Sequence, residues 1–411
     1  MSNMTNCIVA QSGGPTVAIN ASLAGVIDGV KKSKTYNKIY GSIHGIQGVL
    51  RRQYIDLTDS SEDFITSLCA TPAMYLGSCR YKLPPFKESP ESYEDIFGVF
   101  KELSIGAFFY IGGNDSMDTA AKLAEYAKEI GSDIKIVGIP KTIDNDLIMT
   151  DHTPGFGSAA KYVATSIREI AYDTYIYDVL SVNIVEIMGR DAGWLTAASA
   201  LARTESVPAP HLIYLPEVAF DKEQFIEDLK KLLPIHRNIV VAVSEGIKDK
   251  DGNYLSATDA AADKFGHAQL SGTGKALEYL VKEKLGIKVR SVEINVLQRC
   301  ASHLASKTDI EESFKLGSHG VYFAENGKSG IMVAVNRLSS SPYKYEIVNV
   351  PVCEVANKAK AVPLDYINKD GNDVTQEMLE YLRPLVQGEV SIHYDNGLPE
   401  YLNLSHLTHM E

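Results

Sequence analysis

The feature that most constrains this fold is an alternation of apolar strand-like runs with amphipathic helix-like runs along almost the whole chain. The strand-like runs lie at residues 7–12, 107–113, 135–140, 181–189, 211–217, 238–246 and 289–298. The helix-like runs lie at residues 17–32, 115–131, 194–202, 221–233 and 274–286. Continuous apolar strands divided by helices predict mainly parallel sheets that are covered on both faces. In such sheets ligands bind beyond the carboxyl ends of the strands, so functional residues are expected there.

The chain is long enough for two or three domains, since 411 residues with 45% apolar side chains can build more than one core. A turn-rich segment, TDHTPGFG, follows the strand-like run at 135–140 and precedes a long helical pattern. This segment predicts a domain boundary near residues 150–154. The expected first domain comprises residues 1–150 plus about 299–355, and the expected second domain comprises residues 151–298 plus about 356–411.

The composition argues against several classes of protein and site. A net charge of −12 disfavours binding to nucleic acids or to anionic membranes. The longest apolar runs are much shorter than the roughly 20 residues of a membrane span, and the N-terminus lacks a basic, apolar, cleavable segment. The five cysteines are scattered and form no CxxC pair, which argues against a disulfide framework or a zinc site. We therefore expect a cytoplasmic protein with reduced cysteines.

Two segments interrupt the alternation. A polar, glycine-containing stretch at residues 248–275 is interpreted as an insertion or a pair of loops, and residues 391–397 as one end of a hairpin. The insertion ends in SGTGKA, which is similar to a P-loop at Lys275, but the earlier glycine position is Gln269 and the hydroxyl position is Ala276. The P-loop pattern therefore fails. The absence of GxGxxG after a strand weakens a dinucleotide oxidoreductase, and a general nucleotide-binding protein stays open.

Two glycine pairs follow strand-like runs. Gly13 and Gly14 lie in SGGPT, and Gly112 and Gly113 lie in GGNDS. Because glycine lets the backbone approach a ligand, and the following helix presents unpaired N–H groups, each pair is a candidate phosphate cradle. A third glycine-containing strand end, GSCR, carries Arg80. Taken singly, such a pair is more often a tight turn, so both interpretations stay open at this point.

The segment PKTIDND, residues 140–146, places Lys141 and two carboxylates at the end of another strand-like run. If the backbone is extended there, Asp144 and Asp146 project to the same side. Two carboxylates on one side can divide the acceptance of a proton from the binding of a divalent metal. The alternative is a solvated turn, because TIDND also has the composition of one.

Isolated charged residues after other strand-like runs favour the ligand-binding interpretation. These residues are Arg190 in MGR, Glu245 in SEG and Arg299 in LQR. A single surface arginine commonly forms an ion pair that contributes little to stability. Several sheet ends that each carry such a group indicate one shared site.

In their order and spacing, these segments resemble the phosphofructokinase family. The segments SGG, LGSCR, GGNDS, PKTIDND, VEIMGR, SEG and LQR cover about residues 5–360. The resemblance implies an α/β fold of two similar Rossmann-like domains with mainly parallel sheets and an active site in the cleft between them. By the same resemblance, the first expected domain binds the phosphoryl donor and the second binds the sugar phosphate.

The resemblance also implies roles for individual residues. Asp144 is the general base that takes the proton from the 1-hydroxyl of fructose 6-phosphate, and Asp146 and Asn114 help to hold Mg²⁺. The expected catalytic residues are Lys141, Thr142, Asp144 and Arg190. The expected sugar-phosphate site comprises Thr142, Asp144, Met188, Gly189, Arg190, Glu245, Arg290 and Arg299. The expected donor site comprises Gly13, Gly14, Arg80, Gly113, Asp115 and Ser116. Such a reaction depends on positioning and charge neutralisation.

Two positions imply pyrophosphate rather than ATP as the donor. ATP-dependent members of the family have GGDGS and PGTIDND, so Asp115 and Lys141 of this chain each replace a glycine. A carboxylate about 4 Å from a nucleotide phosphate repels it by about 4 kcal/mol at an effective dielectric of about 20, whereas Lys141 supplies a cation for pyrophosphate. The expected reaction is a reversible transfer of phosphate from pyrophosphate to fructose 6-phosphate, giving fructose 1,6-bisphosphate. The alternatives are an ATP-dependent 6-phosphofructokinase and a non-catalytic regulatory subunit.

Several positions depart from the family pattern. Asn114 replaces an acidic magnesium ligand of many relatives, and either coordinates the metal or caps the following helix. Val296 and Ser181 replace two usual contacts to the distal phosphate of the sugar, which leaves open whether a longer ketose such as sedoheptulose 7-phosphate is accepted. Arg290 matches an arginine that a neighbouring subunit lends to that phosphate, which implies a homodimer or homotetramer.

Three further kinds of residue are assigned no catalytic role. Glu217 matches an allosteric position of regulated bacterial members, but we interpret it as a solvated acid at a strand end and expect no strong regulation by ATP or ADP. Trp194, the single tryptophan, is expected in the core. The ten histidines have no metal-ligand spacing.

Overall fold

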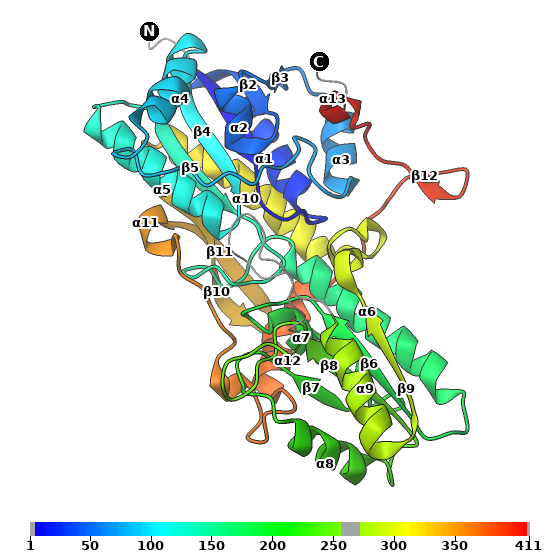
Figure 1. Cartoon of the computed structure of the whole chain (residues 1–411). Helices are drawn as coiled ribbons and strands as arrows, with labels where there is room; N and C mark the ends of the chain where they lie inside the picture. The colour runs from blue at the N-terminus through cyan, green and yellow to red at the C-terminus, as the bar shows by residue number, and fades with distance from the viewer. Residues whose placement is uncertain (1–4, 256–271, 409–411) are drawn as a thin grey trace.

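The computed structural model describes residues 5–255 and 272–408, which form two lobes, each built on one large β-sheet (Figure 1). The first sheet has the strand order β11-β10-β5-β4-β1-β2-β3, and the second has the order β7-β8-β6-β9. The strands of the first are β1 (Thr5–Gln11), β2 (Tyr36–Ser42), β3 (Tyr54–Asp56), β4 (Ile105–Gly112), β5 (Lys135–Pro140), β10 (Ile331–Ser340) and β11 (Tyr343–Pro351). Those of the second are β6 (Ser181–Ile187), β7 (Leu212–Tyr214), β8 (Asn238–Ser244) and β9 (Lys288–Glu293).

Helices pack against both faces of each sheet. The first lobe contains α1 (Ile19–Lys32), α2 (Gly45–Leu50), α3 (Glu62–Ala70), α4 (Pro90–Glu102), α5 (Asn114–Glu129), α10 (Lys307–Glu325) and α11 (Val352–Val355). The second contains α6 (Phe156–Tyr175), α7 (Trp194–Ala198), α8 (Lys222–Leu232), α9 (Thr273–Leu285) and α12 (Gln376–Leu382). In the first sheet Val9 and Phe109 face one core, whereas their strand neighbours Ile8 and Phe108 face the other.

The pairing of the strands is mainly parallel. In the first sheet only the two edge strands, β3 and β11, pair antiparallel with their neighbours. All pairs of the second sheet are parallel. This arrangement confirms the predicted α/β class, and it places the carboxyl ends of β1, β4 and β5 side by side.

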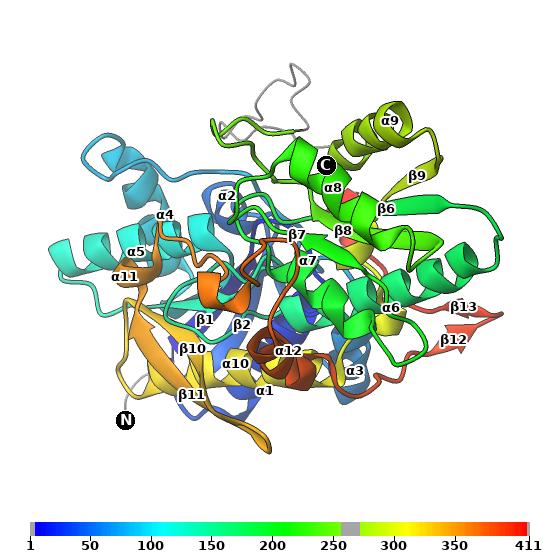
Figure 2. The same ribbon diagram turned by 90° about the horizontal axis from the view of Figure 1, so that it is seen from below.

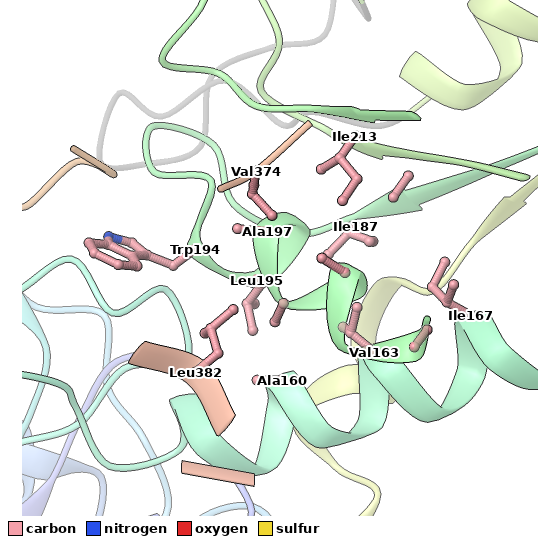
Figure 3. Packing of buried hydrophobic residues seen from close by; sticks show 14 of the residues in the cluster. Ala160, Val163, Ile167, Ile187, Trp194, Leu195, Ala197, Ile213, Val374 and Leu382 are labelled. Carbon is pink, nitrogen blue, oxygen red and sulfur yellow. The ribbon is translucent and has the colours of Figure 1, made fainter. Parts of the chain in front are cut away.

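The core of the second lobe includes part of the C-terminal tail. Val163 of α6 packs in one cluster with Ile187 of β6 and Leu195 of α7, and Leu382 of α12 completes this cluster (Figure 3). Trp194 belongs to the same cluster and is 3% exposed, so its expected place in the core is confirmed.

The end of the tail departs from the expected division into domains. Residues 356–411 were all expected in the second domain, but Leu402 packs against the first core. His406 Nε2 also lies 2.7 Å from the carbonyl oxygen of Tyr75 in the first lobe. The expectation is therefore wrong for these last residues. Leu402, through its apolar contacts, and His406, through its ring contact with Tyr75, pack against the first lobe instead.

Two other expectations concern the ends of strands. The hairpin expected at residues 391–397 is present as β12 (Tyr394–Asp395) and β13 (Leu398–Pro399), and it extends away from the lobes in both views (Figures 1 and 2). The strand-like run at 289–298 is shorter than expected, since β9 ends at Glu293 and Asn295–Arg299 forms a 3₁₀ turn. Arg299 thus lies at the end of a turn.

Three earlier expectations concern the insertion, the cysteines and membrane spans. Residues 256–271 of the expected insertion, Gln269 among them, lie outside the described part of the chain. The five cysteines carry free thiols. Within residues 5–255 and 272–408, no helix has the combination of length and hydropathy that a membrane span requires. Helix α13 (Ser405–Thr408) ends the described chain.

Helices α1 and α10 cross at a distance that only glycine allows. A Cβ atom at Gly25 would lie 1.9 Å from the carbonyl oxygen of Phe314, and one at Gly317 would lie 2.1 Å from that of Ser22. Both distances are far below van der Waals contact. The close crossing seats α10 in the core that α1 shares with the first sheet.

We expect Gly25→Ala to destabilise the protein by about 1–3 kcal/mol, because the added methyl group forces the two helices apart. Gly98→Ala is the matched control: Gly98 is an exposed position of α4 with no atom within 4 Å of an added Cβ. There the change should stabilise the helix by up to about 1 kcal/mol. Thermal unfolding of both variants checks this, and equal melting temperatures would contradict the assigned role of the crossing.

Candidate active site

The residues of the expected phosphate cradle follow three adjacent strands of the first sheet. Gly13 and Gly14 follow β1, Gly113 follows β4, and Lys141 follows β5. The backbone N–H of Lys141 donates to the carbonyl oxygen of Gly112 at 2.9 Å. A Cβ at Gly13 would lie 4.0 Å from the nitrogen of Gly113. The structure therefore brings the two glycine pairs and Lys141 together.

The Lys141 side chain lies beneath this cradle. Lys141 is 2% exposed, and its Nζ donates to the carbonyl oxygen of Gly14 at 2.7 Å. A Cβ at Gly13 would lie only 3.1 Å from Nζ, and Gly13 has φ +86°, so a side chain at position 13 would be both strained and crowded. Burial lowers the pKa of Lys141 to about 8, with the charge of Arg299 acting in the same direction and Asp144 and Asp146 opposing it.

Arg299 reaches the same cradle from its turn. Its Nη1 would lie 3.4 Å from a Cβ at Gly14. Its charge also lowers the pKa of Asp144, so the guanidinium group lies within electrostatic reach of that acid. The cradle is thus bordered by the cations of Lys141 and Arg299.

The TIDND segment is a turn and not an extended strand. Strand β5 ends at Pro140, and Asn145 adopts a left-handed φ of +55°. The backbone N–H of Asp144 donates to Thr142 Oγ1 at 3.1 Å, which is the bond expected of such a turn. The expectation of an extended backbone is wrong. The alternative of a solvated turn is also wrong, because Asp144 and Asp146 are both half-buried and burial is the main cause that raises the pKa of each.

The two carboxylates lie close enough to affect each other. Burial raises the pKa of Asp144, opposed mainly by Lys141, by the Thr142 hydroxyl at 3.4 Å and by Arg190 and Arg299. Burial and the neighbouring charge of Asp144 raise the pKa of Asp146 to about 6. Protonation of one acid, or a bound cation, would relieve this repulsion.

The half-buried side-chain amide of Asn114 is engaged by backbone groups of residues 357–358. Its amide nitrogen donates to the carbonyl oxygen of Lys358 at 2.5 Å, and its Oδ1 accepts from the backbone N–H of Asn357 at 2.5 Å. The N-cap of α5 is Gly113, with no capping side chain, so the proposed capping role of Asn114 is wrong. Among the residues that the structure describes, no group of three or more His, Cys, Asp or Glu side chains is placed to hold a metal ion.

The second lobe contributes the ends of β6 and β8. Ser244 Oγ donates to the carbonyl oxygen of Gly189 at 2.6 Å, and the N–H of Gly189 donates to Glu245 Oε1 at 3.3 Å. A Cβ at Gly246 would lie 1.8 Å from the carbonyl oxygen of Arg190, so the two loops touch directly. Met188 packs beside the second core.

Glu245 and Arg190 belong to the same electrostatic cluster as Asp144. Burial raises the pKa of Glu245 to about 7, with Asp144 also raising it and the N–H of Gly189 and Arg190 lowering it. Arg190 Nε is buried and has no hydrogen-bond partner among the described residues. A buried guanidinium N–H without an acceptor lowers the stability of the folded protein, and an anionic ligand that accepts its hydrogen bond would remove this cost.

Of the other predicted residues, Asp115 and Ser116 follow Gly113 at the start of α5, whereas Arg80 and Arg290 lie on other segments. Asp115 is exposed in the first turn of α5, and Ser116 is buried beside it. Arg80 is exposed in the loop that follows Gly77. Arg290 is exposed on the edge strand β9, where its Nη1 lies 3.8 Å from Asp173 Oδ2. Nothing in the described contacts joins Arg290 to the cradle of its own chain.

Two residues that organise the site were given no such role by the sequence. Glu217 Oε1 accepts from the backbone N–H groups of Gly193 and Val362, each at 2.8 Å, so its interpretation as a solvated acid is wrong. Lys360 donates from Nζ to the carbonyl oxygen of Asp151 at 2.7 Å. Lys360 lies in NKAKAV, which matches no motif.

The chain is similar to known proteins in both sequence and structure. The sequence profile of the phosphofructokinase family matches residues 6–332. The chain is 42% identical over 405 residues to a pyrophosphate–fructose 6-phosphate 1-phosphotransferase of Xanthomonas campestris pv. campestris, covering 98% of this chain and 96% of that one. It is 41% identical to a protein of the same name from Methylococcus capsulatus, covering 97% and 96%. A crystal structure of a pyrophosphate-dependent phosphofructokinase from Marinobacter aquaeolei superposes with a TM-score of 0.87 at 38% identity, covering 97% of this chain and 95% of that one.

The pKa of Asp146 generates a prediction about stability. Because the pKa of Asp146 in the folded protein, about 6, lies above the ordinary 3.8, ionisation of Asp146 opposes folding. The stability that the protonated carboxyl group contributes is fully present below pH 3.8 and is lost as the pH rises through 6. In metal-free buffer, Asp146→Asn should therefore be more stable than the wild type by about 1–3 kcal/mol at about pH 7.5, and by much less at about pH 4.5.

Thermal unfolding at the two pH values, in the presence of a chelator, checks this prediction. The matched control is Asp95→Asn, because Asp95 is exposed on α4. The free energy of unfolding of Asp95→Asn should differ from that of the wild type by the same small amount at both pH values. Equal melting temperatures of Asp146→Asn and the wild type at neutral pH would contradict the account.

Proposed function

The chain belongs to the phosphofructokinase family, and we propose that it transfers a phosphoryl group from inorganic pyrophosphate to the 1-hydroxyl of fructose 6-phosphate. The product is fructose 1,6-bisphosphate, and the reaction is reversible. The observation that carries the proposal is the buried ammonium group of Lys141, 2.7 Å from the carbonyl oxygen of Gly14, at a position where ATP-dependent relatives have glycine. The names of relatives that are about 40% identical over nearly the whole chain support the same donor.

Asp144 is the general base in this proposal. A carboxylate whose pKa is raised by burial accepts a proton more readily near neutral pH than an exposed one. Its hydrogen bonds with Thr142 fix its direction at the turn. The proton of the sugar hydroxyl therefore passes to Asp144 as the hydroxyl oxygen attacks the phosphoryl group.

The cations around the acids neutralise the charge that gathers on the phosphoryl group. Lys141 and Arg299 border the donor cradle, and Arg190 lies within electrostatic reach of Asp144 from the second lobe. Positioned charges of this kind supply most of the catalysis in phosphoryl transfer. The unpaired Nε of Arg190 supports an anionic group of the substrate beside it.

Mg²⁺ fits the pair of acids. Asp144 and Asp146 are half-buried, and burial together with the charge of Asp144 raises the pKa of Asp146, so a divalent cation bound there would offset the repulsion between the two carboxylates. Mg²⁺ is typically held by one or two carboxylates together with substrate phosphates and water, which agrees with the lack of a larger ligand cluster among the described residues. When bound, the ion supplies charge neutralisation to the donor phosphates.

The substrate sites divide between the lobes. The donor cradle uses Gly13, Gly14 and Gly113 of the first lobe, and Asp115 at the start of α5 excludes the larger nucleotide by repulsion. The sugar phosphate lies against Gly189, Arg190 and Glu245 of the second lobe. The exposed Arg290 on β9 serves a neighbouring subunit in a homodimer or homotetramer, and the enzyme works in the cytoplasm.

The choice of donor is tested by rates of fructose 1,6-bisphosphate formation with Mg²⁺ and either pyrophosphate or ATP. We expect turnover with pyrophosphate and little or none with ATP. Asp144→Ser is the control for chemistry and should lose about 10²- to 10⁴-fold with pyrophosphate while still binding substrate. Faster turnover with ATP would overturn the proposal, as would full activity of Asp144→Ser.

A further inference from the structure

Residues 357–360, which we call the strap, follow α11 and connect parts of the site that are far apart in the sequence. At the start of the strap, the backbone N–H of Asn357 and the carbonyl oxygen of Lys358 bind the side-chain amide of Asn114. Asn357 Nδ2 also donates to Asp118 Oδ1 at 2.8 Å. This end of the strap is therefore fixed to the first turns of α5, next to the donor cradle.

At the other end of the strap, every hydrogen bond that Lys360 donates goes to the loop after the catalytic acid. Its backbone N–H donates to the carbonyl oxygen of Asp146 at 2.7 Å. Its Nζ donates to the carbonyl oxygens of Asp151 at 2.7 Å and Thr150 at 3.2 Å, and to Asn145 Oδ1 at 3.3 Å. One side chain thus satisfies three acceptors of a segment only seven residues long, 145–151.

Lys360 also reaches the second lobe through Trp194. The indole N–H of Trp194 donates to the carbonyl oxygen of Lys360 at 2.9 Å, and Lys360 Nζ lies 5.2 Å from the centre of the indole ring. A cation at this distance from an aromatic face is attracted to it. Trp194 is itself fixed in the second core, so it gives the ammonium group a rigid support.

The loop needs such support because it has little of its own. After the single bridge of Thr142 with Gly155, residues 143–149 make no further sheet pairing, and both Asn145 and Met149 have left-handed φ values, +55° and +61°. Left-handed conformations of residues other than glycine persist only where surrounding contacts hold them. At Asn145 those contacts come from Lys360 Nζ, which donates to Asn145 Oδ1 at 3.3 Å, and from the Tyr381 hydroxyl, which accepts from Asn145 Nδ2 at 2.8 Å.

We propose that Lys360 is a positioning residue for phosphoryl transfer: its ammonium group holds the loop that carries Asp144 and Asp146 at a fixed distance from the donor cradle and the second lobe. This inference rests on the proposed function. Lys360 contacts no reacting atom, since all of its described polar partners belong to the loop and to Trp194. Without it the acids move relative to the substrates, and a displacement of about 1 Å can cost about 10²-fold in rate.

The test compares kcat and KM of Lys360→Met and Lys360→Arg with those of the wild type. Lys360→Met should lose about 30- to 100-fold in kcat, with both KM values within about 3-fold, because the substrates still meet their own ligands. Lys360→Arg keeps a buried donor cation and should recover kcat to within about 5-fold of the wild type. If Lys360→Met does not fold, Lys360→Gln, which lacks the charge, is judged by the same criterion.

The matched control is Lys161→Met. Lys161 also donates from Nζ to two carbonyl oxygens, those of Gly388 at 2.6 Å and Ala305 at 3.3 Å, but away from the loop. It should lower the melting temperature and leave kcat within about 2-fold, because only loop position affects the chemical step. A wild-type kcat in Lys360→Met overturns the inference, as does an equal loss in Lys161→Met. An inactive wild type would instead overturn the proposed function.

Discussion

The contact on which the rest of the site depends is the hydrogen bond from Lys141 Nζ to the carbonyl oxygen of Gly14. It places a buried cation beneath a cradle of glycines, and it explains why position 13 has no side chain. Burying an ammonium group is costly unless it is paired, and here Asp144 and Asp146 provide the opposing charge. The buried cation and the two acids therefore stabilise one another's charged forms.

Both lobes share in that balance. Arg190 and Glu245 approach Asp144 from the second sheet, while Arg299 approaches from the turn after β9. Glu217 joins the loop of Gly193 to Val362, and Lys360 joins the loop after Asp144 to Trp194. In our account Glu217 and Lys360 touch no substrate, but they fix the distance between the groups that bind it.

The sequence was sufficient for the parts of the site that follow strands directly. Gly13, Gly113, Lys141, Arg190 and Glu245 each end an apolar run, and parallel sheets collect such ends at one edge. It was insufficient for Lys360, whose bond to Asp151 spans 209 residues and leaves no local pattern. The turn at Asn145, the return of Leu402 to the first core and the edge strands β3 and β11 also arise from tertiary packing, which periodicity does not record.

The central claim, that the charge of Lys141 binds the donor, is tested most directly by titrating Mg²⁺-imidodiphosphate, a pyrophosphate analogue, into the wild type and Lys141→Met by calorimetry. The account predicts at least about 10-fold tighter binding by the wild type near pH 7, which corresponds to about 1.4 kcal/mol of binding free energy. Because the pKa of Lys141 is about 8, this advantage should narrow as the pH rises above that value. Equal affinities of the two proteins at neutral pH would contradict it.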